Sequence, residues 1–157
     1  MRKNRAFTIV EIIVVIVTIS ILAGITSLGY AGLQKSSRDN ERESDAVVIQ
    51  NSLEAYYEKT GTYPARDAII GQTDTVINFL MRDLNLPASA IVSPSATEGT
   101  KNSLVWGTSA TIQSYSYISY QQNDSQCHTT ATTCTKYRLV YGSEQDGTAT
   151  LSSKYGW

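Results

Sequence analysis

The feature that most constrains this chain is an uncharged run from Ile12 to Leu33. As an α-helix this run would span about 33 Å, enough to cross a hydrocarbon core of about 30 Å. Three cations, Arg2, Lys3 and Arg5, precede it. Such a bias predicts a cytoplasmic N-terminus, with everything after the run outside. The 157-residue chain is then left with roughly 120 residues for one soluble domain.

The helical pattern continues over residues 34–60, which contain no Gly or Pro. Apolar side chains recur there at helical spacing on an otherwise charged helix: Ala46, Ile49, Leu53 and Tyr56. Gly61 suits a left-handed C-cap and Pro64 follows it. We therefore expect one helix from about Phe7 to Lys59, apolar over 7–33 and amphipathic over 34–60.

The remaining residues predict a small β-sheet. Residues 61–103 form a connecting region, with one short helix at 75–84 capped by Asp74 or Thr75. This helix would face inward with Ile77, Leu80, Met81 and Leu84. From 104 to 157, strand-like segments follow one another: "SLVWG", "SYSYISY", "TKYRLVY" and "GTATLSSKY". The expected fold class is α+β, a long N-terminal helix packed on an antiparallel sheet of three to four strands.

Two cysteines, Cys127 and Cys134, flank a polar, Thr-rich stretch. In an exported domain a disulfide is the default interpretation of such a pair. Two free thiols are the next alternative, and a metal site with His128 is the last. The many tyrosines of the strand segments are interpreted as packing and rim residues, with a surface-adhesion role as the alternative.

Composition argues against several function classes. The 13 Lys and Arg residues are balanced by 14 Asp and Glu, and no basic stripe is present for binding nucleic acid. With a single His and no nucleophile motif, we expect neither an enzyme nor a cofactor. Asp124, Glu144 and Asp146 lie in predicted loops and are weak candidates for a calcium site.

The carboxylate of Glu11, just before the apolar run, separates three interpretations of the N-terminus. A secretory signal peptide could be cleaved near Ala23 and Gly24, but the run is long and continues into an amphipathic helix. A single-pass anchor accounts for length and orientation but not for Glu11, because a charge in the membrane is costly. The third interpretation rests on a resemblance.

The sequence "MRKNRA" followed by "FTIVEIIVVIVTI" resembles the class III signal of type IV prepilins, pseudopilins included. The resemblance is specific over residues 1–64 and architectural from there to Trp157. It implies that a prepilin peptidase cleaves between Ala6 and Phe7 and that Phe7 is then N-methylated. It also implies that Glu11 neutralises the amino terminus of a neighbouring subunit's Phe7. Ala6 stands where the family most often has Gly.

The resemblance further implies a structural subunit of a pilus-like filament. Its partners would be copies of itself, the peptidase, and the assembly platform with its ATPase. The subunit would lie in the cytoplasmic membrane first and in an extracellular filament later, serving adhesion, twitching motility, DNA uptake or secretion. A non-polymerising, membrane-anchored binding domain is the alternative.

The apolar run lacks the Pro that many relatives carry, and has glycines between Gly24 and Gly32 instead. Each Gly costs a helix about 0.8 to 1.0 kcal/mol relative to Ala. We expect this segment either to loosen in a filament or to allow close packing of helices, as the spacing of Ser20 and Gly24 suggests.

Overall fold

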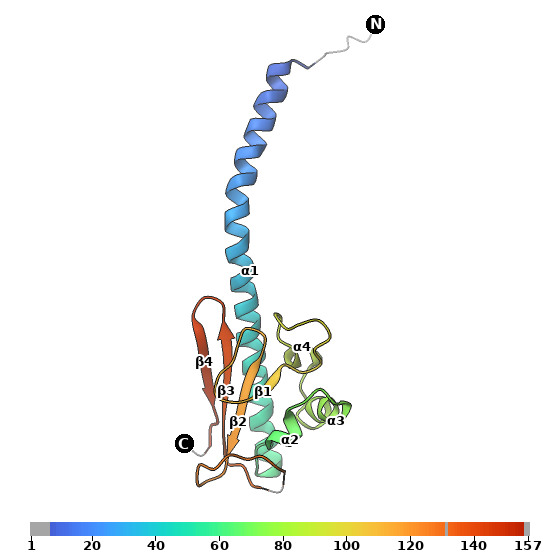
Figure 1. Cartoon of the computed structure of the whole chain (residues 1–157), viewed down its shortest axis with the longest axis vertical. Coiled ribbons are helices and arrows are strands. Elements are labelled where there is room, and N and C mark those ends of the chain that lie inside the picture. Colours follow the sequence, from blue (N-terminus) through green and yellow to red (C-terminus); the bar gives the residue numbers. More distant parts are fainter. Residues whose placement is uncertain (1–6, 131, 156–157) are drawn as a thin grey trace. The chain divides into compact units, whose positions relative to one another are not determined.

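The computed structural model describes residues 7–130 and 132–155 (Figure 1). The elements in chain order are α1 Ile9–Thr60, α2 Arg66–Ile69, α3 Asp74–Asn78, the π-helical turn η1 Phe79–Asp83, α4 Ala88–Ile91, β1 Leu104–Trp106, β2 Tyr115–Tyr120, β3 Lys136–Ser143 and β4 Gly147–Ser152. The chain divides into two compact units between Ser36 and Ser37, so α1 contributes to both.

The first unit contains the apolar part of α1. It is long and apolar enough to cross a membrane, by length and composition, and none of the most apolar stretch is buried. The hydroxyls of Thr18 and Ser20 donate to the carbonyls of Val15 and Ile16, at 2.8 and 2.6 Å. These polar groups are therefore satisfied within the helix, as an apolar environment requires. The stretch from Gly24 to Gly32 is helical in this single chain.

In the second unit, α1 packs through the side chains that its sequence spacing predicted. Ala46, Ile49 and Leu53 are fully buried, and Tyr56 is partly buried. The helix ends at Thr60, one residue beyond the predicted end. Gly61 has φ +73°, and its N–H donates to the carbonyl of Tyr57 at 2.7 Å. This left-handed C-cap confirms the predicted stop signal.

The three predicted strands and the possible fourth, "SLVWG", form one sheet in the order β1-β2-β3-β4 (Figure 1). The pairs β2–β3 and β3–β4 are antiparallel, as predicted. However, β1 is parallel to β2, with Leu104 beside Tyr115, so the sheet is mixed and not wholly antiparallel. Alternation in a sequence shows which side chains share a face, but it carries no information on strand direction.

One face of the sheet and α1 enclose the main core. From α1 the core takes Ala46, Ile49 and Leu53, and from the strands it takes Leu104, Tyr115, Tyr117, Tyr137 and Leu139. The strand residues alternate along β2 and β3, so they project from one face. The prediction that the tyrosines are mainly packing residues holds for Tyr115, Tyr117 and Tyr137, which are fully buried.

The connecting region differs in detail from the predicted helix at 75–84. Its N-cap is Thr73, whose side chain accepts from the N–H of Val76, and not Asp74 or Thr75. The helix changes to a π-helical turn at Phe79. A π turn alters the angle between successive side chains, so Met81 is 43% exposed although the regular helical period places it inward.

The connection between β1 and β2 lies so close to Gly142 that we expect only Gly to fit at this position. A Cβ on Gly142 would lie 2.6 to 2.8 Å from the backbone of Thr111 and Ile112. Gly142→Ala should therefore lower the free energy of unfolding by about 1 to 3 kcal/mol, the usual cost of overpacking. Thr148→Ala, at the exposed residue paired with Gly142 on β4, is the control and should change stability by less than about 0.5 kcal/mol. Denaturant unfolding in detergent measures both, and equal stability of the two variants would contradict the prediction.

Candidate assembly and processing site

The N-terminus of α1 is organised by Thr8 and Glu11. The N–H and the hydroxyl of Thr8 both donate to Glu11 Oε2, at 2.8 and 2.7 Å. In return the N–H of Glu11 donates to Thr8 Oγ1 at 3.2 Å. Thr8 directly precedes the helix and Glu11 is its third residue, so the pair forms a capping box. It satisfies backbone donors that a helix start otherwise leaves unpaired.

The capping box gives Glu11 an intrachain role that the sequence analysis missed. The signal was present, because Thr-x-x-Glu before an apolar run is the sequence pattern of this motif. A carboxylate near the positive end of a helix is also favoured by the helix dipole. Glu11 is thus already hydrogen-bonded in the single chain, and its pairing with a neighbouring Phe7 remains a prediction.

The predicted cleavage point lies at the edge of the described residues. Ala6 falls outside them, whereas Phe7 is described and is 82% exposed. The apolar side chains that follow are exposed as well: Ile9, Val10, Ile12, Ile13, Val14, Val15, Ile16, Val17, Ile19, Ile21, Leu22, Ile25, Tyr30 and Leu33. A soluble protein rarely exposes so large a contiguous apolar surface, which instead marks an interaction with a membrane or a protein.

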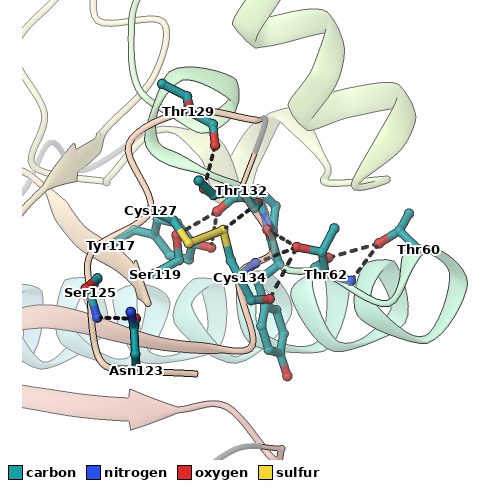
Figure 2. Close-up of a disulfide and its surroundings, with 12 residues drawn as sticks. Thr60, Thr62, Tyr117, Ser119, Asn123, Ser125, Cys127, Thr129, Thr132 and Cys134 are labelled. Carbon is teal, nitrogen blue, oxygen red and sulfur yellow. Dashed lines mark hydrogen bonds between the residues drawn. A yellow bond between two sulfur atoms is a disulfide. The ribbon is translucent and has the colours of Figure 1, made fainter. Parts of the chain in front are cut away.

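The predicted disulfide between Cys127 and Cys134 is present (Figure 2). Both cysteines are fully buried, and their backbones bind the segment that leaves α1. The N–H of Tyr63 donates to the carbonyl of Cys134 at 2.8 Å, and the N–H of Arg66 donates to that of Cys127 at 3.0 Å. Figure 2 also shows the N–H of Cys134 donating to Thr62 Oγ1, at 2.8 Å. The disulfide loop, which lies in the β2–β3 connection, therefore holds the segment that follows α1.

Two of the three weak calcium candidates are paired with cations. Asp124 accepts from Lys136 Nζ at 2.6 Å. Glu144 receives a bidentate pair from Arg38, at 2.7 and 2.8 Å. Asp146 lies in the β3–β4 turn. Within residues 7–130 and 132–155, no cluster of three or more His, Cys, Asp or Glu side chains is arranged to hold a metal ion.

Glu144 belongs to a charge cluster centred on Arg42, which is fully buried. Arg42 Nη2 donates to Glu144 Oε1 at 3.1 Å and also to Asp39, while Nη1 donates to Ser95 Oγ at 2.7 Å. The hydrogen bond from Arg38, followed by that from Arg42, lowers the pKa of Glu144 to about 2. The cluster joins α1 to the β3–β4 turn through charge-assisted hydrogen bonds.

Comparison with known proteins finds partial sequence matches to proteins of one name. The chain is 31% identical over 67 residues to the type II secretion system core protein G of Vibrio cholerae, a match that covers 43% of this chain and 46% of that protein. It is 36% identical over 62 residues to the protein of the same name from Escherichia coli K12, covering 40% and 43%. No family model and no solved structure matches.

This chain is a distant homologue of type II secretion core protein G. The match spans less than half the length of these relatives. Together with the long helix α1 and the four-stranded sheet, it identifies the fold as a pilin-like α+β fold. The resemblance to type IV prepilins and pseudopilins is thereby confirmed at the level of distant homology.

The capping box of this pilin-like chain predicts a local effect of Thr8→Ala. Loss of the N-cap oxygen costs about 0.5 to 2 kcal/mol of helix stability, so amide exchange over residues 9–12 should accelerate about fivefold. Thr8→Ser keeps the oxygen and should exchange like the parent chain. Thr18→Ala removes a mid-helix hydroxyl and should leave residues 9–12 unchanged. Hydrogen exchange read by mass spectrometry in detergent measures all three, and unchanged exchange in Thr8→Ala would contradict the capping role.

The lowered pKa of Glu144 predicts an acid-dependent contribution to stability. Its folded-state pKa of about 2 lies below the ordinary value near 4.5, so the stabilisation is complete above that value and is lost as the pH falls toward 2. Glu144→Gln should therefore lower the melting temperature at neutral pH, and its curve should converge with that of the parent near pH 2. Asp74→Asn, at an exposed ion pair with Lys101, should have little effect. Parallel curves for parent and Glu144→Gln across this pH range would contradict the assignment.

Proposed function

We propose that this chain is a pilin-like filament subunit that is inserted in the membrane as a precursor and polymerises through residues 7–33, which include the first part of α1. The observation that carries the proposal is the contrast between the two units. The second unit buries its apolar side chains in a core of its own, whereas the described apolar side chains of the first unit are exposed. Such a surface needs an apolar environment, supplied first by lipid and later by the same helix of neighbouring subunits.

The capping box suits a subunit that moves between these environments. A charged carboxylate buried without hydrogen bonds is costly in an apolar environment. In the single chain Thr8 supplies hydrogen bonds to Glu11. In the filament, cleavage between Ala6 and Phe7 would create an amino group on Phe7, and Glu11 of one subunit would pair with that group on the next. The attraction of opposite charges is stronger there than in water, so the pair would set the register of assembly.

The names of the relatives favour a secretion-type filament over the other uses. Each matched protein is a type II secretion system core protein. The proposed partners are accordingly a prepilin peptidase, an assembly platform with its ATPase, and further copies of this chain. Adhesion and twitching motility have no comparable support.

Mass spectrometry of the protein from its native cell envelope tests processing. A chain that begins at N-methylated Phe7 is the expected result. A chain that begins at Met1 would support the single-pass anchor, and one that begins near Gly24 would support a secreted domain.

Substitution of Glu11 tests assembly. Glu11→Val should reduce the filament yield at least tenfold, because the amino group of a neighbouring Phe7 loses its partner, while membrane insertion is retained. Glu58→Gln removes an exposed carboxylate on the amphipathic part of α1 and should assemble normally. Sheared filaments quantified by immunoblot, alongside membrane fractions, give the comparison. If Glu11→Val assembled as well as Glu58→Gln, the proposed register role would be lost.

A further inference from the structure

In the second unit, aromatic rings contact one another in a continuous line. This line does not include the N-terminal residues Phe7, Thr8 and Glu11. The contacts, given as distances between ring centroids, are Tyr155–Tyr57 5.4 Å, Tyr57–Tyr63 4.4 Å, Tyr63–Tyr137 4.7 Å, Tyr137–Tyr117 5.9 Å, Tyr117–Trp106 6.2 Å and Trp106–His128 5.6 Å. Tyr155 is 44% exposed and Trp106 is partly exposed, whereas Tyr63, Tyr117 and Tyr137 are buried. The line therefore connects two surface points through the core.

A buried carboxylate lies at the middle of this line. Glu54, on α1, is only 2% exposed. The hydroxyl of Tyr63 donates to its Oε2 at 2.7 Å, and the hydroxyl of Tyr137 donates to its Oε1 at 2.9 Å. The N–H of Lys154 also donates to Oε1, at 3.0 Å. Donors that point at both oxygens suit the ionised carboxylate, which only accepts hydrogen bonds.

The buried tyrosines of the line differ in what could take their protons. Tyr63 and Tyr137 each donate to a carboxylate, which can hold a proton. The hydroxyl of Tyr117 instead donates to the carbonyl of Pro64 at 2.7 Å, and a backbone carbonyl is not a base in water. Burial, together with the nearby Glu54, raises the pKa of Tyr63 and Tyr137 far above the ordinary value, so both phenols are protonated at rest.

We propose that Tyr63, Tyr137 and Glu54 form a redox site that holds a one-electron-oxidised tyrosine. A one-electron oxidant, such as a diffusing inorganic radical, would remove an electron from Trp106 or Tyr155. The resulting one-electron vacancy, or hole, would move from ring to ring through the contacts above. Tyr63 or Tyr137 would then donate an electron to fill it and would become the oxidised residue.

The proton accounts for the resting place of the radical. As the phenol loses one electron, its O–H bond breaks and the proton passes to Glu54 along the existing hydrogen bond, leaving a neutral phenoxyl radical and a protonated carboxyl group. Return of one electron brings the proton back to the phenol. The hydroxyl of Tyr117 has no such proton acceptor, so the hole would pass through Tyr117 without a stable radical forming there. This proposal does not depend on polymerisation.

Pulse radiolysis of the full chain in detergent, with azide radicals as the oxidant, tests the site. A Trp157→Phe background leaves Trp106 as the remaining indole. In this parent, the indole radical should decay as the phenoxyl radical appears. Glu54→Gln should slow that transfer roughly 100-fold, the lower end of what a positioned proton acceptor contributes. The parent should also be slower in deuterium oxide, since a proton moves with the electron.

Two further variants keep the test decisive if Glu54→Gln does not fold. The double variant Tyr63→Phe with Tyr137→Phe retains both rings and removes both hydroxyls, so the transfer from Trp106 should fall at least tenfold. Tyr141→Phe is the matched control, because Tyr141 lies on the same sheet face and outside the line of rings, and its transfer should equal that of the parent. Near-ultraviolet circular dichroism confirms folding of each variant. Parent-like transfer in the double variant, or in a folded Glu54→Gln, would overturn the proposal.

Discussion

The second unit depends on how the buried polar groups of α1 are satisfied. Arg42, Asp45 and Glu54 lie on the same buried side of the helix as Ala46, Ile49 and Leu53. Buried charges without partners cost several kcal/mol, so each must meet a specific group. Arg42 meets Glu144, Asp45 accepts from the hydroxyl of Tyr115 at 2.8 Å, and Glu54 accepts from Tyr63 and Tyr137. Apolar contacts tolerate small shifts along a helix, whereas these polar contacts fix one position of residues 37–60 on the sheet.

The disulfide completes this arrangement at the end of α1. The helix ends at the Gly61 cap. Without further contacts, the residues that follow it would be mobile. Hydrogen bonds from Tyr63 and Arg66 to the carbonyls of Cys134 and Cys127 hold them instead. The covalent bond limits the freedom of the loop that supplies those carbonyls. The same contacts place the hydroxyl of Tyr63 at Glu54, so the loop also supports the proposed redox site.

The two parts of α1 illustrate one helix adapted to two environments. In residues 37–60, packing on the sheet satisfies the apolar face. In residues 9–33 the described apolar side chains are exposed, and even the hydroxyls of Thr18 and Ser20 are satisfied by the helix backbone. The capping box then supplies the carboxylate with hydrogen bonds at the one point where a charge enters this apolar stretch. These features agree with the distant homology to a secretion core protein and with the proposed filament.

The elements whose signals are local could be predicted from the amino-acid sequence alone. A run of apolar residues, the stripe at Ala46, Ile49 and Leu53, the stop at Gly61 and the alternation of β2 and β3 each reflect periodicity or backbone preference within a few residues. The pairing of two cysteines and the prepilin-like start were also readable. The capping box could also have been predicted from the spacing of Thr8 and Glu11, although the carboxylate of Glu11 was interpreted only through a role in assembly.

Features that depend on residues distant in sequence became evident only in the folded chain. The direction of β1, parallel to β2, and the contact of Thr111 and Ile112 with Gly142 are both features that no local pattern encodes. The π turn at Phe79, and with it the exposure of Met81, departs from the regular helical period that the local sequence predicts. Some partners of Arg42 and Glu54 are distant in the chain: Glu144 is 102 residues from Arg42, and Tyr137 and Lys154 are 83 and 100 residues from Glu54. Charged residues on a helix usually face solvent, so their burial became evident only once the sheet and its loops were in place.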